Sequence, residues 1–211
     1  MTTPDTPVEF TQPDSFSFDA ESNTAIETIV KRYPAGKQAS AVIPLLYVVQ
    51  RQMKRQTGSA WVPTAGMDEV ARRLDMAPIR VYEVATFYFM FNLKPIGTWH
   101  LQVCTTTPCW LRGSDEVVAA CRATTGIEEW GETSADGVFT MTEVECVGGC
   151  VNAPIIQVND DFYEDLDADS TTRLLEALRR DDPPPKGSLK GRQTSAPEGG
   201  ATTLTTLQFE S

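Results

Sequence analysis

The sequence predicts an α+β protein in which an N-terminal helical bundle is followed by a smaller domain of strands and helices. Between residues 20 and 92 the apolar residues recur every three or four positions, as in helices that share a core. From Thr98 onward they alternate with polar residues instead, which is typical of strands. All five cysteines fall in this second part. We therefore expect an extended acidic arm (1–19), a helical bundle (20–92), a cysteine-bearing domain (93–180) and a flexible tail (181–211).

The composition limits the classes of function. The formal net charge of −11 over 211 residues argues against nucleic acid and anionic membranes as primary partners. No run of 18 apolar residues is present, so we expect no direct membrane span. The first basic residue is Lys31, so we expect neither a secretory signal nor an Arg-rich transit peptide. Cysteines in such a chain are typical of metal binding inside the cell.

The arm, residues 1–19, is rich in Thr, Pro and acidic residues and carries Phe10, Phe16 and Phe18. This composition predicts little structure of its own. Its aromatic side chains have two interpretations that the sequence leaves open. They either attach the arm to a partner protein or cover the core of the chain itself.

The bundle is expected to contain four helices, each with an apolar stripe at helical spacing. The fourth is apolar on nearly all sides, so we expect it to be buried on several of them. The expected ranges are 25–30, 38–56, 67–74 and 79–91.

Residues 67–87 also resemble a helix-turn-helix. A recognition helix needs polar and basic residues on the face that reads the major groove. The second helix of this pair has Arg80 as its only cation and is otherwise largely aliphatic and aromatic. We therefore favour a tight structural helix pair over a DNA-binding motif.

The second domain is predicted to follow the order strand, helix, three strands, helix. Ser114 is a candidate N-cap for the first helix, and Asp169 or Ser170 for the second. Cys121 lies mid-helix at core spacing, so we expect a structural thiol, and His100 lies mid-strand without a ligand role. This order resembles a thioredoxin-like domain, in which the position of Pro154 is commonly a cis-proline. The expected elements are a strand at 99–103, a helix at 114–125, a strand at 138–144, a hairpin at 155–163 and a helix at 171–180.

The remaining cysteines form two short pairs, Cys104-x4-Cys109 and Cys146-x3-Cys150, separated by 36 residues. Zinc sites are usually built from C-x2-4-C knuckles with a comparable second pair, and C-x4-C with C-x3-C after a long gap is a looser fit. A [2Fe–2S] cluster takes four thiolates on a wider frame, so longer spacings suit it. We favour the cluster. A zinc site and plain buried thiols remain as alternatives.

The residues between the cysteines are compatible with a cluster. Gly148 and Gly149 let the backbone turn its N–H groups toward the sulfurs, and successive N–H groups stabilise an anion. Thr105, Thr106 and Thr107 place hydroxyl donors beside the first pair, although a simple polar turn explains each of them as well.

Three stretches carry a resemblance to a known family. They are Thr-Thr-Thr-Pro-Cys109-Trp-Leu-Arg-Gly, Val-Glu-Cys146-Val-Gly-Gly-Cys150-Val-Asn-Ala-Pro and Thr86-Phe87-Tyr88. Over about residues 20–180 the chain resembles the small [2Fe–2S] subunits of respiratory NADH:quinone oxidoreductase, complex I. The gamma-type subunits of NAD-linked formate dehydrogenases and hydrogenases share the cysteine pattern and are the alternative. A more distant alternative is an iron–sulfur regulator that binds DNA. A further alternative is a zinc-stabilised interaction module.

The resemblance implies a function. Cys104, Cys109, Cys146 and Cys150 would ligate one low-potential [2Fe–2S] cluster that exchanges an electron with FMN. A partner flavoprotein would bind the FMN and NADH, which agrees with the lack of a Gly-x-Gly-x-x-Gly motif here. A large iron–sulfur subunit would be a second partner. The chain would then be a subunit of an oxidoreductase without a catalytic site of its own, on the cytoplasmic side of the bacterial inner membrane.

Overall fold

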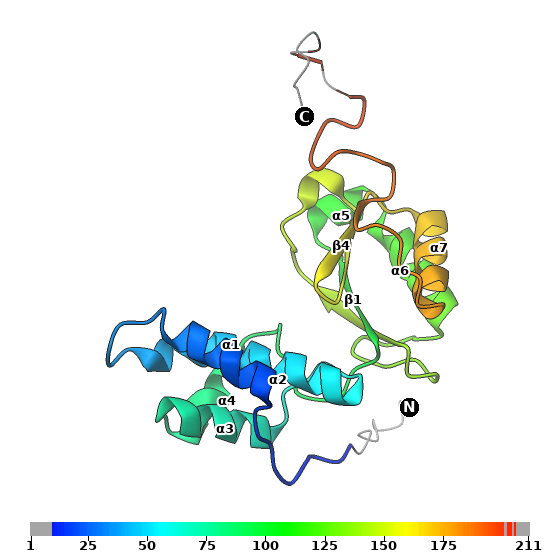
Figure 1. Ribbon diagram of the computed structural model, residues 1–211. Coiled ribbons are helices and arrows are strands. Elements are labelled where there is room, and N and C mark those ends of the chain that lie inside the picture. The colour runs from blue at the N-terminus through cyan, green and yellow to red at the C-terminus, as the bar shows by residue number, and fades with distance from the viewer. Residues whose placement is uncertain (1–9, 201, 204, 206–211) are drawn as a thin grey trace. The chain divides into compact units, whose positions relative to one another are not determined.

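The computed structural model describes residues 10–200, 202, 203 and 205, and its chain forms two compact units (Figure 1). The division lies between Thr98 and Trp99. The sequence predicts it at residue 92, but the segment that follows is tied to the first unit. The Ser59 hydroxyl donates to the Ile96 carbonyl and accepts from the Ile96 N–H, both at 2.7 Å.

The first unit is helical, as predicted. Its elements are α1 (Ala20–Val30), a 3-10 turn η1 (Gln38–Ala41), α2 (Val42–Thr57), α3 (Thr64–Leu74) and α4 (Pro78–Phe87). The 3-10 turn replaces the first part of the helix expected from residue 38. Pro44 therefore lies in the first turn of α2, where its missing N–H has no intrahelical partner to lose. Gly58 ends α2 in the left-handed conformation, with φ 81°.

The arm covers the core of its own unit from Phe10 onward. The Phe18 side chain is 8% exposed, and Phe16 packs against the same buried cluster. The Phe10 ring meets the Trp61 ring edge-on at 5.5 Å between centroids. Gln52 on α2 fixes the backbone here, because it donates to the Ser17 carbonyl and accepts from the Asp19 N–H. Residues 1–9 of the expected arm lie outside the described residues.

Helix α4 differs from its prediction. It ends at Phe87 because Tyr88 takes an extended conformation, with φ −94° and ψ 117°. The expectation that it is buried on several sides is wrong, since only Val81 and Ala85 are buried within it. Phe87 is 74% exposed, and Phe89 in the following turn is 88% exposed. An apolar surface here faces solvent in the isolated chain.

The second unit is built on one mixed sheet. Its strands are β1 (Trp99–Cys104), β2 (Phe139–Val144), β3 (Ile156–Val158), β4 (Asp161–Glu164) and β5 (Gly187–Ser188), in the order β2-β1-β3-β4-β5. β1 is parallel to β2 and antiparallel to β3, so that Leu101 lies opposite Met141 on one side and Val158 on the other. The β3–β4 hairpin turns at Asn159, whose φ of 53° asparagine tolerates better than most residues.

Four helical segments accompany the sheet: α5 (Thr107–Leu111), α6 (Ser114–Thr125), η2 (Cys150–Asn152) and α7 (Ala168–Arg179). Helices α6 and α7 lie together on one side of it (Figure 1). Side chains of both helices and of β1 to β4 form one buried core. Cys121 of α6 is fully buried within that core, as expected of a structural thiol. Among the described residues, no helix combines the length and apolar character needed to cross a bilayer.

Both predicted N-caps in this unit are wrong. Ser114 is the first residue inside α6, and the cap is Gly113 with φ 98°. Helix α7 is capped by Asp167, which precedes both predicted residues. The Asp167 carboxylate accepts from the Ser170 N–H at 2.8 Å, and the Ser170 hydroxyl accepts from the Asp167 N–H at 2.9 Å. This reciprocal capping box satisfies two N–H groups that the helix leaves free.

The segment after α7 differs from the flexible tail that the sequence predicts. β5 pairs in parallel with β4, with Gly187 opposite Tyr163, and Leu189 packs against the domain core. The Tyr163 hydroxyl donates to the Pro184 carbonyl at 3.2 Å. The chain thus continues to build the second unit well beyond residue 180, although part of the predicted tail (201, 204 and 206–211) lies outside the described residues.

Candidate metal centre

The parallel pairing of β1 and β2 positions the two cysteine pairs. Cys104 is the last residue of β1, and Cys146 follows the end of β2 by two residues. Because parallel strands end at the same edge of a sheet, the two loops begin side by side. The Cys104 Sγ lies 2.8 Å from the Glu145 carbonyl oxygen, which joins the end of β1 to the second loop directly.

Cys109 lies on the short helix α5, which the sequence did not predict. Pro108 occupies its first turn, where the fixed φ of proline favours helix initiation. The side chains of Cys104 and Cys109 are each 1% exposed and pack with Ala153 in a small cluster of their own. The first pair is therefore buried.

The second pair lies at the surface on a glycine-rich turn. The Sγ atoms of Cys146 and Cys150 are 3.5 Å apart, and the Gly148 N–H points at the Cys146 Sγ from 3.4 Å. Gly148 has φ 88°, a conformation that favours glycine. At Gly149 a Cβ atom would lie 2.5 Å from the Ile155 Cδ1, so the turn packs too closely for a larger residue without movement of Ile155.

The Ala153–Pro154 bond that follows the second loop is cis, as the resemblance to a thioredoxin-like domain implies. Ile155 comes next, and its backbone contacts both cysteines of the first pair. Its carbonyl accepts from the Cys104 N–H at 3.3 Å, while its own N–H interacts with the Cys109 sulfur.

The two buried thiols, Cys104 and Cys109, differ in hydrogen bonding, and their pKa values are shifted in opposite directions. Burial raises the pKa of Cys104, but hydrogen bonds from Thr106, Cys109 and the Val147 N–H outweigh it and leave that pKa below the ordinary value. Burial and the neighbouring Cys104 thiolate raise the pKa of Cys109 to about 12. The hydrogen bond with Cys146 raises the pKa of Cys150, and the charge of Cys104 adds to this. The two pairs therefore share one electrostatic environment, and metal binding must displace protons from it.

This donor set fits an anionic cluster of the [2Fe–2S] type. The four thiols lie on two loops that begin at one edge of the sheet, and backbone N–H groups of Val147, Gly148 and Ile155 interact with three of the sulfurs. Such donors stabilise negative charge on ligated sulfur. Within the part of the chain that the structure describes, no three Cys, His, Asp or Glu side chains are grouped to hold one metal ion.

Two other residues of types that can bind metal, Cys121 and His100, lie outside the site. Burial in the core raises the pKa of Cys121 to about 12. His100 is buried in β1, with Nε2 2.9 Å from the Thr142 hydroxyl, and burial lowers its pKa to about 4. Burial in the domain accounts for both pKa shifts.

Sequence reasoning missed the polar residues that hold the second loop. Asn152 donates to the Thr194 carbonyl at 2.7 Å, and Arg192 donates to the Val151 carbonyl at 3.2 Å. Arg192 lies in a stretch rich in Gly, Ser and Pro without periodicity, so no sequence signal pointed to it.

Comparisons with known proteins show to which family this chain belongs. A model of the family described as thioredoxin-like [2Fe-2S] ferredoxin matches residues 26–179. The E-type subunit of the NADH-quinone oxidoreductase of Rickettsia bellii (strain RML369-C) is 47% identical over 167 residues, which cover 79% of this chain and 96% of that protein. NADH dehydrogenase [ubiquinone] flavoprotein 2, mitochondrial, of Dictyostelium discoideum is 45% identical over 189 residues, covering 90% of this chain and 74% of that protein.

A solved structure shares the fold at low identity. A chain of an NAD+-reducing [NiFe]-hydrogenase in the air-oxidized state superposes with a TM-score of 0.55 and 19% identity, over 65% of this chain and 23% of that one. This likeness concerns the fold alone. Because the family model spans most of the chain and relatives at nearly half identity match over most of their own length, the chain belongs to the thioredoxin-like [2Fe-2S] ferredoxin family and, within it, to the E-type subunits of NADH-quinone oxidoreductases.

Proposed function

We propose that this chain is the electron-transfer subunit of the NADH-oxidising module of complex I. In this proposal Cys104, Cys109, Cys146 and Cys150 ligate one [2Fe–2S] cluster. The observation that carries it is the meeting of two cysteine pairs at the common edge where β1 and β2 end. The names of the relatives, which are subunits of NADH dehydrogenases, support the assignment to this module.

When bound, such a cluster supplies a one-electron redox centre. The residues of the chain hold it, donate hydrogen bonds to its ligands and keep the first pair away from water. The second pair is exposed. We infer that this open side of the site faces the redox partner, because electron transfer requires close approach of the two centres.

The proposed partner is a flavoprotein subunit that binds FMN and NADH, with a large iron–sulfur subunit in the same module. A flavin accepts electrons in pairs and releases them singly, so it connects NADH to a one-electron centre. We place the assembly as a peripheral complex on the cytoplasmic side of the bacterial inner membrane.

The test compares the chain with and without its flavoprotein. Dithionite should bleach the visible bands of the isolated chain and produce the paramagnetic signal of a reduced [2Fe–2S] centre. NADH should reduce the chain only when the flavoprotein is present. If NADH reduced the flavin-free chain as fast as the complex, a nucleotide site would have to exist here, and the proposal would fail.

A gamma-type subunit of an NAD-linked hydrogenase or formate dehydrogenase is the second candidate. It shares the cysteine pattern, but the solved hydrogenase chain is similar in fold alone, at 19% identity against 47% for the Rickettsia bellii relative, so this candidate ranks lower. Purification of the native complex separates the two, because co-purification with a nickel-containing subunit or a formate-oxidising subunit supports the second candidate.

The DNA-binding alternative has less support. Arg80, the only cation of α4, forms a 2.8 Å ion pair with Glu83 on the same helix. Phe87, at the end of this helix, is 74% exposed, and an exposed aromatic side chain does not match the polar surface that base recognition needs.

A further inference from the structure

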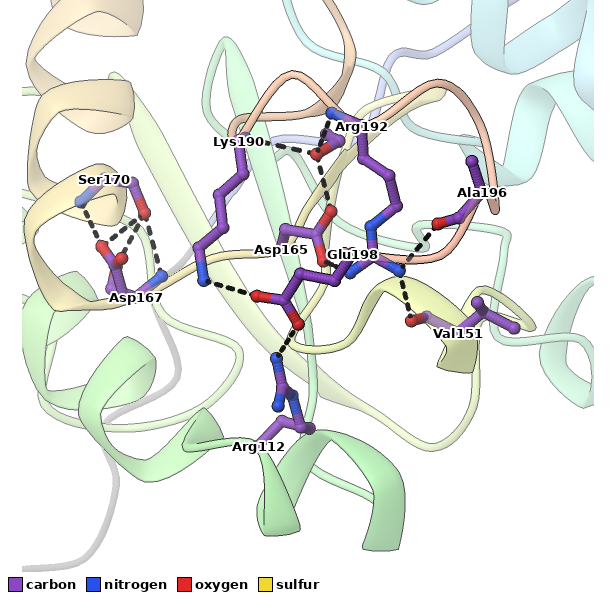
Figure 2. A network of polar contacts seen from close by, with 10 residues as sticks. Arg112, Val151, Asp165, Asp167, Ser170, Lys190, Arg192, Ala196 and Glu198 are labelled. Atoms are coloured by element: carbon purple, nitrogen blue, oxygen red, sulfur yellow. Dashed lines mark hydrogen bonds and ion pairs between the residues drawn. The ribbon is translucent and has the colours of Figure 1, made fainter. Parts of the chain in front are cut away.

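Residues 187–198, here called the C-terminal strap, run across both cysteine-bearing loops (Figure 2). The strap begins with β5 and lies beyond residues 26–179, which the family model matches.

The strap is anchored by a buried ion pair between Arg192 and Asp165, whose side chains are 9% and 1% exposed. Ser188 completes the anchor, because its hydroxyl donates to the Asp165 Oδ2 at 2.6 Å and accepts from the Arg192 N–H at 3.2 Å. A buried pair offsets its desolvation only when the remaining donors and acceptors are satisfied. The carboxylate meets this condition, since each of its oxygens has a partner here, whereas the Arg192 Nε is buried without a hydrogen-bond partner among the described residues.

From this anchor the strap holds the second cysteine loop. The same guanidinium that binds Asp165 donates through Nη1 to the carbonyl of Val151, the residue after Cys150, at 3.2 Å (Figure 2). The Thr194 carbonyl accepts from Asn152 at 2.7 Å. The Asp165 N–H donates to the Asn152 carbonyl, also at 2.7 Å. The turn that carries Cys150 is thus fixed by the strap and by the end of β4 together.

The contact with the first loop is weaker. Glu198 pairs with Arg112, three residues after Cys109, at 3.3 Å, and with Lys190 at 4.0 Å. About half of each of these side chains is exposed. Exposed ion pairs of this kind contribute little to stability. The strap therefore holds the site mainly through Arg192 and through the hydrogen bond from Asn152 to the Thr194 carbonyl.

We propose that Arg192 is a positioning residue for the cluster: anchored on Asp165, it fixes the Val151 carbonyl and so the backbone of Cys150. The inference rests on the proposed ligand role of Cys150. The planar guanidinium serves a carboxylate and a carbonyl at once, whereas the ammonium of lysine acts as a point charge and does not reproduce this fork.

Two variants of the full-length, cluster-loaded chain test the proposal. Arg192→Lys keeps a charge beside Asp165 but loses the fork to Val151. The double change Asp165→Asn with Arg192→Met removes both charges, and asparagine tolerates the φ of 55° at position 165. Iron release to a ferrous chelator should accelerate on the order of tenfold in both, because a charge-assisted hydrogen bond is lost. The paramagnetic signal of the reduced cluster should also change shape.

Two controls separate positioning from general stability. Glu198→Gln alters only the exposed pair and should leave iron release and the signal unchanged. Leu178→Val weakens the domain core beside the start of β1, the end opposite Cys104, where the Leu178 carbonyl accepts from Trp99. It should lower the melting temperature without changing the signal.

The outcomes are distinct. An unchanged signal and release rate in both Arg192 variants overturns the positioning role, and so does faster release that only follows the melting temperature as in Leu178→Val. If the double variant does not fold, Arg192→Lys alone decides. A wild-type chain without iron and sulfide in [2Fe–2S] proportion refutes the proposed function itself, and this inference with it.

Discussion

At the scale of single residues, Cys104 and Cys121 show what distinguishes a ligand candidate from a structural thiol. Both are buried. Cys104 receives hydrogen bonds that lower its pKa despite burial, whereas only burial acts on the pKa of Cys121 and raises it to about 12. A thiolate is the form that binds metal. The pKa of the proposed ligand Cys109 is raised to about 12 as well, so its place on a cysteine-bearing loop, and not its pKa, separates it from Cys121.

Changing any of the four proposed ligands to Ala should therefore sharply lower the iron and sulfide content of the purified chain, because one coordination position is left open. Cys121→Ala is the matched control. It should keep the cluster and lower the free energy of unfolding by about 1 kcal/mol, the effect of losing a small buried side chain. Iron loss in the Cys121 variant, with an unaffected Cys146 variant, would contradict the assignment.

His100 predicts a pH dependence of folding. Burial lowers its pKa to about 4, so the folded chain binds the proton less well than the unfolded chain, whose histidine has a pKa near 6.5. Stability therefore falls as the pH decreases from about 6.5 to 4, and at pH 5 the loss from this group is on the order of 2 kcal/mol.

The measurement compares urea unfolding of the wild type and His100→Gln at pH 6.8 and pH 5.0. Glutamine retains a polar group for Thr142 but does not titrate, and His100 is the only histidine of the chain. The difference in unfolding free energy between the two pH values should be smaller in the variant. Equal pH dependence in both proteins would show that the histidine is accessible to protons in the folded state.

At the scale of elements, the start of α7 shows where a local signal is ambiguous. Asp167, Asp169 and Ser170 are all competent caps by residue type. Asp167 is selected because the chain leaves β4 there in extended conformation, with φ −139° and ψ 177°. That path depends on the sheet, which the local sequence does not reveal.

Asp167→Ala should accordingly reduce the free energy of unfolding by about 1 kcal/mol, because it leaves the Ser170 N–H without its acceptor. Asp169→Ala is the matched control, and it removes only a first-turn charge worth a few tenths of a kcal/mol. Chemical denaturation of both variants gives the comparison. A larger loss in the Asp169 variant would reverse the assignment of the cap.

Regular patterns made most elements predictable, and contacts between distant residues explain the exceptions. The alternation over Trp99–Val103 is observed as β1. The two cysteine pairs lie in the segments that follow β1 and β2. The hold of Arg192 on Asp165 joins residues 27 positions apart and leaves no local pattern. The early end of α4 is similar, since apolar residues continue after Phe87 while the backbone leaves the helix.

At the scale of the whole molecule, two units with separate cores leave several large apolar side chains exposed. Phe87 and Phe89 belong to the first unit, and Trp110, Leu111 and Val151 adjoin the cysteines in the second. Where exposed apolar side chains form a contiguous patch, that patch commonly marks a protein interface. This agrees with a chain that functions inside an assembly.

The double change Phe87→Ser with Phe89→Ser should thus leave the stability of the isolated chain within about 0.5 kcal/mol of the wild type, since both side chains are already exposed. Binding to the purified partner subunits should weaken at least tenfold. Calorimetry and a pull-down with the module measure the two effects. Val81→Ser, at a fully buried position of the same helix, should instead destabilise the bundle.

The position of β1 in the sheet also sets the order in which a ribosome can complete the site. β1 pairs with β2 and β3, both of which are synthesised after it. The 36 residues between Cys109 and Cys146 correspond to roughly two to seven seconds of translation at about 5–20 residues per second. During that interval the first pair has no second pair beside it, and the strap follows later still. If the four cysteines are the ligands, as proposed, we expect iron loading to follow the synthesis of most of the chain.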